Sequence, residues 1–327
     1  MAKKKRIKLN DQQLMLDASR VADIYHQMTI DLFDQVIDRV RERGTASLED
    51  NPYIWQLEKM SEMGLLNNDN IKLIARYSGV AEEQLRYVIE NEGYKVYKDT
   101  KTQLLESMGG GDFVTNNLIQ TTLANYVNQT TGDIDNLINT TLPKSVRKVY
   151  QDIVEEAVAK VITGLMNPDK AISTTVMKWA EKGFYGFTDK GGKRWRADAY
   201  ARTIIKTTSW RVYREARKAP ADELGIDTFY YSMKPAAREM CAPLQHQIVT
   251  TGQARIEEGE KIFALDDYGY GKPGGCQGIN CGHTMTPFIP GANYKPDLPE
   301  HLANLTPEEA IENANVQSKQ RAIERSI

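Results

Sequence analysis

The sequence contains no apolar run long enough to cross a membrane, so we expect no membrane span. Residues 3–8 are basic, but no apolar segment follows them, and a secretory signal is therefore not expected either. Neither positive nor negative charge is in large excess, because the formal net charge of the 327 residues is only -2. A protein that binds nucleic acid over its whole surface, as histones do, is excluded by this balance.

Cysteine is scarce, and its distribution is uneven. The three cysteines, Cys241, Cys276 and Cys281, all lie in the last third of the chain. An odd number gathered at one end argues against the disulfide framework of a small secreted protein and indicates assembly in a reducing cytoplasm. With 327 residues the chain is long enough to bury a core and to form more than one domain.

Helical spacing dominates the first two thirds of the sequence. Apolar or small residues alternate spacings of four and three along one seam, which predicts a long helix that ends near Gly44: Leu14, Ala18, Val21, Tyr25, Met28 and Leu32. Such a seam packs against another helix, and packing within one chain is commoner than packing between copies. We therefore expect an internal contact, with a homo-oligomer as the alternative.

A second helical region lies between Leu65 and Glu92. Its pattern predicts a helix over 71–77, a turn at 78–80 and a further helix from Glu82, which resembles a DNA-binding helix-turn-helix. Four glutamates on or near the second helix would repel DNA: Glu82, Glu83, Glu90 and Glu92. We therefore interpret this region as a helical corner and keep a DNA-binding regulator as the weaker reading.

Glycines and prolines interrupt the helical pattern in the middle of the chain. Gly109–Gly111 predicts an interruption, and a break or hinge is expected over 112–141. The following pattern predicts helices over 142–166 and 171–182, a hairpin of strands 184–188 and 193–195, and a helix over 197–218 closed by Pro220.

The fold class predicted from these patterns is α+β. A mostly helical N-terminal two thirds is followed by a small α+β C-terminal module and a polar tail. Strands are expected at 229–233, 247–250, 261–265 and 284–288, and a polar helix is expected from Thr306. The predicted domains are 1–110 (helical), 111–194 (helical, ending in the hairpin), 195–291 (the module) and 292–327 (linker and tail).

The helix before the module carries a basic stripe. Its side chains are interleaved with aromatic residues and are candidates for contact with DNA or with an acidic partner: Arg194, Arg196, Arg202, Lys206, Arg211 and Arg214, continued by Arg217. A merely solvated face is an equally good interpretation of the stripe.

The module holds the chemically distinctive residues. Four of them offer the soft and borderline ligands of a tetrahedral zinc site, with Cys276 as an alternative ligand: Cys241, His246, Cys281 and His283. Zinc knuckles of the Cys-x-x-Cys kind are missing, so buried thiols beside a hydrogen-bonded histidine, or a disulfide, remain as alternatives. A thiol–imidazole pair also suits a nucleophile, but no orienting third residue is recognisable, and we expect no enzyme.

One ordered set of residues resembles a known family. It comprises Arg238, Cys241, Leu244-Gln245, Tyr268-Gly269-Tyr270-Gly271, Gly274-Gly275, Asn280-Cys281-Gly282-His283 and Phe288-Ile289-Pro290-Gly291. This order resembles the minor capsid protein 2 family of tailed phages, which is related to the Mu F-like head morphogenesis domain. Gly282 stands where the family usually has arginine, and His246 where it usually has glycine.

The resemblance implies a structural minor head protein of a tailed bacteriophage. Such a protein is assembled in the host cytoplasm and lies in the virion, in the capsid interior or at the portal vertex. Its implied partners are the portal protein, the major capsid protein and packaged DNA, and its implied roles are head assembly and DNA packaging or delivery. The alternative is an enzyme or toxin-like effector built on the Cys/His module.

Overall fold

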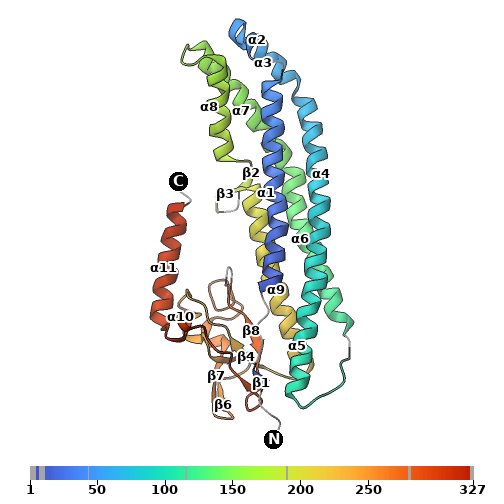
Figure 1. Ribbon diagram of the computed structural model, residues 1–327, viewed down its shortest axis with the longest axis vertical. Helices are drawn as coiled ribbons and strands as arrows, with labels where there is room; N and C mark the ends of the chain where they lie inside the picture. The colour runs from blue at the N-terminus through green and yellow to red at the C-terminus, as the bar shows by residue number, and fades with distance from the viewer. Residues whose placement is uncertain are drawn as a thin grey trace. The chain divides into compact units, whose positions relative to one another are not determined.

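The chain forms two compact units in the computed structural model (Figure 1), which describes residues 5–6, 12–42, 44–114, 116–188, 191–278 and 281–324. Unit 1 combines the N-terminal residues up to Leu14 with Ile89–Leu123 and Ser209–Ile327, and unit 2 combines Met15–Val88 with Ala124–Thr208. Each unit is therefore assembled from pieces that are distant in sequence. The four-part division of the sequence into domains stays a prediction.

Unit 2 is a helical bundle with a small hairpin. Its helices are α1 (Gln12–Arg41), α2 (Ala46–Asp50), α3 (Pro52–Ser61), α4 (Met63–Tyr87), α7 (Leu142–Ile162), α8 (Pro168–Lys182), and parts of α6 (Asn117–Thr140) and α9 (Ala197–Glu223). All six residues of the predicted α1 seam are at least 97% buried within the single chain. The interpretation of the seam as an internal contact is therefore confirmed. The predicted hairpin is also present, as β2 (Tyr185–Thr188) paired with β3 (Arg194–Arg196).

Helix α4 corrects the predicted helix-turn-helix. It runs without interruption through Ser78, Gly79 and Val80, and no turn forms there. Its buried side chains keep one face before and after this point: Leu66, Leu73, Ile74, Ala81 and Leu85. A glycine inside a helix costs only about 1 kcal/mol relative to alanine, which burial on both sides outweighs. The geometry of a DNA-reading corner is therefore absent from this segment.

Two further expectations for helices were wrong. The segment after the glycine loop forms helix α6 instead of a hinge, because Ile119, Leu123, Val127 and Ile134 bury at helical spacing. Its Thr130 hydroxyl donates to the Tyr126 carbonyl 2.7 Å away, so the threonines fit into the helix. Helix α9 continues through Pro220 to Glu223, because a proline this near a helix end removes only one late hydrogen bond.

Unit 1 is built around the C-terminal module, whose sheet has the order β6-β7-β5-β4-β8. The strands are β4 (Thr228–Tyr231), β5 (Ile248–Thr250), β6 (Arg255–Glu257), β7 (Glu260–Ala264) and β8 (Met285–Pro287). Strand β4 pairs antiparallel with β5 and β8, whereas β5 and β7 are parallel. Four of these strands were predicted, and the partly exposed β6 was missed. The α+β class is confirmed.

The remaining elements of unit 1 frame this sheet. The π-helical segment η1 (Val88–Glu92) leads into α5 (Gly93–Ser107), and β1 (Lys5–Arg6) pairs with β9 (Asn293–Tyr294). Short 3-10 helices follow β4 and β7, as η2 (Ala242–Leu244) and η3 (Leu265–Tyr268). The tail forms α10 (Glu300–Ala303) and the predicted polar helix α11 (Pro307–Glu324), which projects from the module in Figure 1. Among the described helices none is long and apolar enough to span a membrane.

Candidate functional site

Three of the predicted ligands meet in one buried cluster on the module. Cys241 precedes η2, Cys281 follows the glycine-rich loop, and His283 lies just before β8. The Cys241 and Cys281 sulfurs are 3.8 Å apart, and the Cys281 sulfur lies 3.5 Å from His283 Nδ1. All three ligand atoms lie within 4.8 Å of one another, and each residue is at least 95% buried. We call this group the thiol–imidazole cluster.

The two other candidate ligands point elsewhere. His246 is half-buried, and its Nδ1 lies 3.0 Å from the Tyr230 hydroxyl. Burial is the largest cause that lowers the pKa of His246, and the nearby Lys295 lowers it further. The Cys276 sulfur hydrogen-bonds the Leu265 carbonyl at 3.6 Å, and burial raises the pKa of this thiol to about 11. Neither side chain belongs to the cluster.

Gln245 fixes the orientation of His283. The Gln245 side-chain oxygen lies 3.0 Å from His283 Nε2 and also accepts the Lys234 backbone N–H at 2.6 Å. Because that N–H can only donate, the accepting atom is the amide oxygen, and His283 Nε2 must carry its own proton. The lone pair of neutral His283 is therefore on Nδ1, facing the Cys281 sulfur. The Tyr231 ring stacks on the imidazole with centroids 5.0 Å apart.

Two arginines hold the backbone of the loop that carries Cys281. Arg214 on α9 donates to the Gln277 carbonyl at 3.1 Å and to the carbonyl of Cys281. Arg238 donates to the Gly275 carbonyl at 3.2 Å. Burial lowers the pKa of Arg214, and its guanidinium faces the module instead of solvent.

The glycine-rich loop folds back on itself. The Cys276 N–H donates to the Tyr268 carbonyl at 2.9 Å, which closes the loop. A side chain at Gly275 would place its Cβ 1.8 Å from the Gly269 carbonyl oxygen, so only glycine fits there. Asn280, part of the same sequence motif, lies outside the described residues.

The cluster has unequal thiols. The hydrogen bond to Cys281 raises the pKa of Cys241, and burial raises it further. The hydrogen bond from Cys241 lowers the pKa of Cys281 against the opposing effect of burial, and His283 lowers it further. Cys281, His283 and Gln245 thus supply a thiol, a base and an orienting amide, the third of which the sequence did not reveal. All three side chains are buried, which shields the sulfur from solvent.

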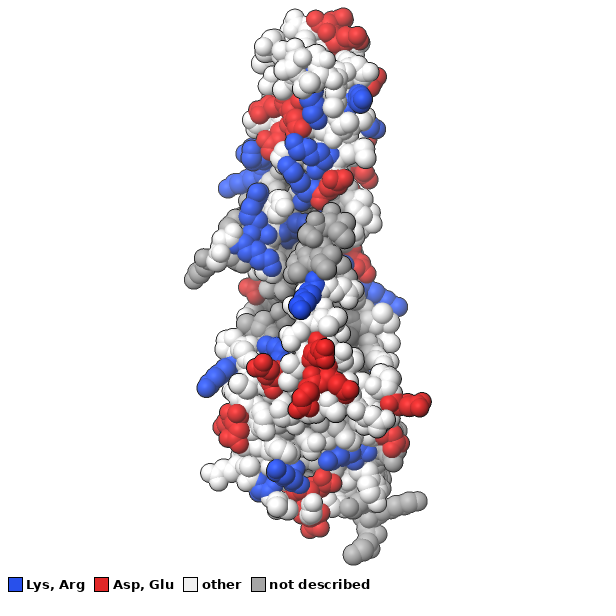
Figure 2. Space-filling view, turned by 90° about the vertical axis from the view of Figure 1, so that its left-hand side faces the viewer, with Lys and Arg blue, Asp and Glu red and all other residues white. Residues whose placement is uncertain are grey.

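The basic residues of the predicted stripe differ in exposure. Arg194, Arg202, Lys206 and Arg211 are exposed, whereas Arg196 and Arg214 are partly buried. Two of them pair with acids, Arg202 with Asp23 at 2.7 Å and Arg196 with Asp198 at 3.2 Å. Arg217 corrects the predicted exposed face, because it is 99% buried and donates to the Thr286 hydroxyl. On the surface of unit 2 in the upper half of Figure 2, basic patches alternate with acidic ones.

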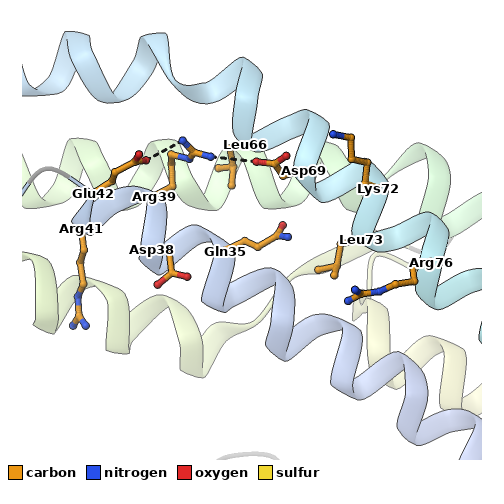
Figure 3. A pocket seen from close by; sticks show the side chains of 10 residues that line it. All are labelled: Gln35, Asp38, Arg39, Arg41, Glu42, Leu66, Asp69, Lys72, Leu73 and Arg76. Atoms are coloured by element: carbon orange, nitrogen blue, oxygen red, sulfur yellow. Dashed lines mark hydrogen bonds and ion pairs between the residues drawn. The ribbon is translucent and has the colours of Figure 1, made fainter.

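Unit 2 has a hollow of about 680 Å³ between α1 and α4 (Figure 3). Charges of both signs line it, and Arg39 is paired with Glu42 at 2.9 Å and with Asp69 at 3.2 Å. Neither cysteine nor histidine is among the residues that line it: Gln35, Asp38, Arg39, Arg41, Glu42, Leu66, Asp69, Lys72, Leu73 and Arg76. No sequence pattern indicates this hollow, because its walls come from separate helices. The paired charges indicate a role in helix packing.

Known proteins similar to this chain are phage structural proteins. The family model described as phage minor capsid protein 2 matches residues 9–327. A structural protein of Lactococcus phage LL-H is 29% identical over 321 residues, covering 94% of this chain and 84% of that protein. A structural protein of Lactococcus phage mv4 is 38% identical over 67 residues, covering 20% of this chain and half of that protein. No solved structure matches the chain.

Proposed function

The chain belongs to the phage minor capsid protein 2 family, and on that premise we propose that it is a minor head component at the portal vertex or in the capsid interior. In this role it contacts the portal protein and the major capsid protein. It acts in head assembly and in DNA packaging or delivery. Its place is the virion, and it acts without catalytic turnover.

The burial of the thiol–imidazole cluster is the main support for a role without catalytic turnover. A catalytic nucleophile must touch its substrate, whereas Cys281 is 95% buried and His283 is 96% buried. The surrounding contacts hold the backbone of the loop in place, since the side chains of Arg214 and Arg238 each donate to loop carbonyls. The most distinctive residues of the chain therefore support a fixed shape, which suits a part of a particle.

The proposed contacts with DNA or an acidic partner rest on the exposed basic residues. Arg194 and Lys206 in unit 2 and Arg211 in unit 1 are exposed. Arg214 is better explained as a support for the module, because its guanidinium donates to two loop carbonyls. Contact through the exposed members would weaken as salt is added.

Purified particles test the proposal directly. Mass spectrometry of virions, with peptide amounts compared with those of the portal protein, is expected to find the chain in low copy number. Heads assembled without the gene are expected to be defective in assembly, packaging or delivery. Coexpression with the portal protein is expected to yield a complex on size-exclusion chromatography. Particles that lack the polypeptide would overturn the proposal.

An enzyme is the second candidate, and the arrangement of Cys281, His283 and Gln245 is the observation that favours it. It requires an opening that exposes the Cys281 thiol. Alkylation of the native protein by iodoacetamide measures that exposure, and Cys276→Ser provides a variant that leaves the cluster intact. Rapid labelling at Cys281, with a substrate-consuming activity that Cys281→Ser abolishes, would favour the enzyme.

A further inference from the structure

Two of the three ligand-to-ligand distances in the thiol–imidazole cluster match a tetrahedral metal coordination shell, and the third is at most 4.8 Å. Zinc bonds to sulfur at about 2.3 Å and to imidazole nitrogen at about 2.0–2.1 Å. In a tetrahedron these bonds separate two sulfurs by about 3.8 Å and a sulfur from a nitrogen by about 3.5 Å. The corresponding separations are 3.8 Å between Cys241 and Cys281 and 3.5 Å between Cys281 and His283 Nδ1.

From this match we propose that Cys241, Cys281 and His283 bind one Zn²⁺ ion through their two sulfurs and Nδ1. Two thiolates and one imidazole form the soft and borderline donor set that zinc prefers, and the three ligand atoms already lie within 4.8 Å of one another. Binding releases the thiol protons to solvent and forms three metal–ligand bonds, with no change of oxidation state.

The surroundings of His283 support the same assignment. A metal-binding imidazole donates its second N–H to an oxygen acceptor, which holds the ring and its tautomer. His283 Nε2 donates to Gln245, whose oxygen is itself held by the Lys234 N–H. The free lone pair is therefore on Nδ1, the atom that faces the sulfurs.

A tetrahedral zinc needs a fourth ligand beside these three residues, and a water molecule is the expected one. The Tyr231 hydroxyl is 3.9 Å from the Cys281 sulfur and hydrogen-bonds Cys241, so it borders the cluster. This hydroxyl can accept or donate a hydrogen bond to a water molecule that completes the shell. The zinc crosslinks η2 to the segment before β8, which adds structural stability.

Elemental analysis of the full-length protein, expressed with zinc in the medium, tests the assignment with two matched pairs of variants. About one zinc per chain is expected in the wild type, Cys276→Ser and His246→Gln. Zinc affinity is expected to fall at least tenfold in Cys241→Ser and His283→Gln. Gln245→Leu is expected to weaken it about 10- to 100-fold, because the imidazole loses its support. If Cys241→Ser kept its bound zinc and His246→Gln lost it, the assignment would be overturned.

The wild type alone provides a test that does not depend on variant folding. Cobalt added to the chelator-treated protein is expected to give a thiolate-to-metal absorption band, and zinc is expected to displace it. A strong chelator is expected to lower the Tm. Lack of stoichiometric zinc together with lack of the cobalt band, or thiol counting that finds a Cys241–Cys281 disulfide, would refute the site. None of these results bears on whether the chain is found in virions.

Discussion

Lys101 Nζ lies 2.6 Å from Glu223 Oε2, which ties α5 to the last residue of α9. The ammonium also donates to the Val114 carbonyl at 2.7 Å, and the carboxylate also accepts from Asn116 and Tyr97. The Lys101 side chain is only 7% exposed and that of Glu223 20%. These partners all come from unit 1, so the pair links α5, the segment after it and the end of α9 within that unit.

Lys101→Met is expected to reduce the free energy of unfolding by about 1–2 kcal/mol, because the Glu223 carboxylate loses its cation and the Val114 carbonyl loses its donor. Urea titration followed by circular dichroism measures the loss. Lys95→Met is the matched control on the same helix, since Lys95 is 62% exposed and pairs with Glu92 at 3.6 Å. The control is expected to change stability by less than about 0.5 kcal/mol. Equal effects of the two substitutions would contradict a special role for Lys101.

The same pair predicts a dependence of stability on pH. Burial raises the pKa of Glu223, but hydrogen bonds from Lys101, Asn116 and Tyr97 lower it by more, and the net shift is downward. A lowered carboxyl pKa contributes stability above the unfolded pKa of about 4.3, and this contribution is lost as the pH falls through the folded pKa.

Glu223→Gln should therefore be less stable than the wild type at neutral pH and should approach it in acid. Unfolding free energies measured between neutral pH and pH 3 give the difference at each pH. A constant difference across this range would show that ionisation of Glu223 contributes nothing.

Gly275→Ala is expected to destabilise unit 1 by about 2 kcal/mol or more, because its Cβ would overlap the Gly269 carbonyl. Gly274→Ala is the neighbouring control, since an added Cβ there meets no atom of the described chain within 4 Å and its φ is not positive. That control is expected to stay within about 1 kcal/mol of the wild type. Thermal melts of the two variants compare them, and similar Tm values would mean that the loop is not closely packed.

Gly79→Ala tests whether α4 is continuous. In an exposed helix interior, alanine is expected to stabilise the protein by about 0.5–1 kcal/mol, whereas a turn that needs a left-handed glycine would be destabilised. Gly93→Ala gives the contrasting case, because its Cβ would lie 2.9 Å from a Val212 methyl group and is expected to destabilise. Chemical denaturation measures both changes. A loss of stability in Gly79→Ala would argue for the helix-turn-helix.

Sequence patterns predicted the helices in which the spacing of apolar residues matches the buried face. The seam of α1 and the apolar spacing of α7 each specify one buried face, and both helices form where expected. The continuity of α4 and α6 was missed, because glycine, threonine and asparagine are local turn signals. In both helices the burial of side chains on either side of these residues outweighs the local preference.

Three of the four preferred zinc ligands meet, and the reason that His246 does not join them is the alternation of strand side chains. Tyr230 and Tyr231 are consecutive on β4 and therefore point to opposite faces of the sheet. Tyr231 packs with Cys241 and Cys281, whereas Tyr230 belongs to a separate apolar cluster and hydrogen-bonds His246. The support from Gln245 and Arg214 was not predictable, because it depends on contacts between segments far apart in sequence.

Leu104 shares its apolar cluster with Phe229 and Met285, although helices α6 to α9 are translated between Leu104 and these two residues. A ribosome must therefore deliver almost the entire polypeptide before this cluster can close. Until then, Leu104 lacks these apolar neighbours, and exposed apolar side chains of this kind are targets for chaperones. Ordering of unit 1 is thus a late event in biosynthesis, which ties completion of the subunit to its readiness for incorporation into a particle.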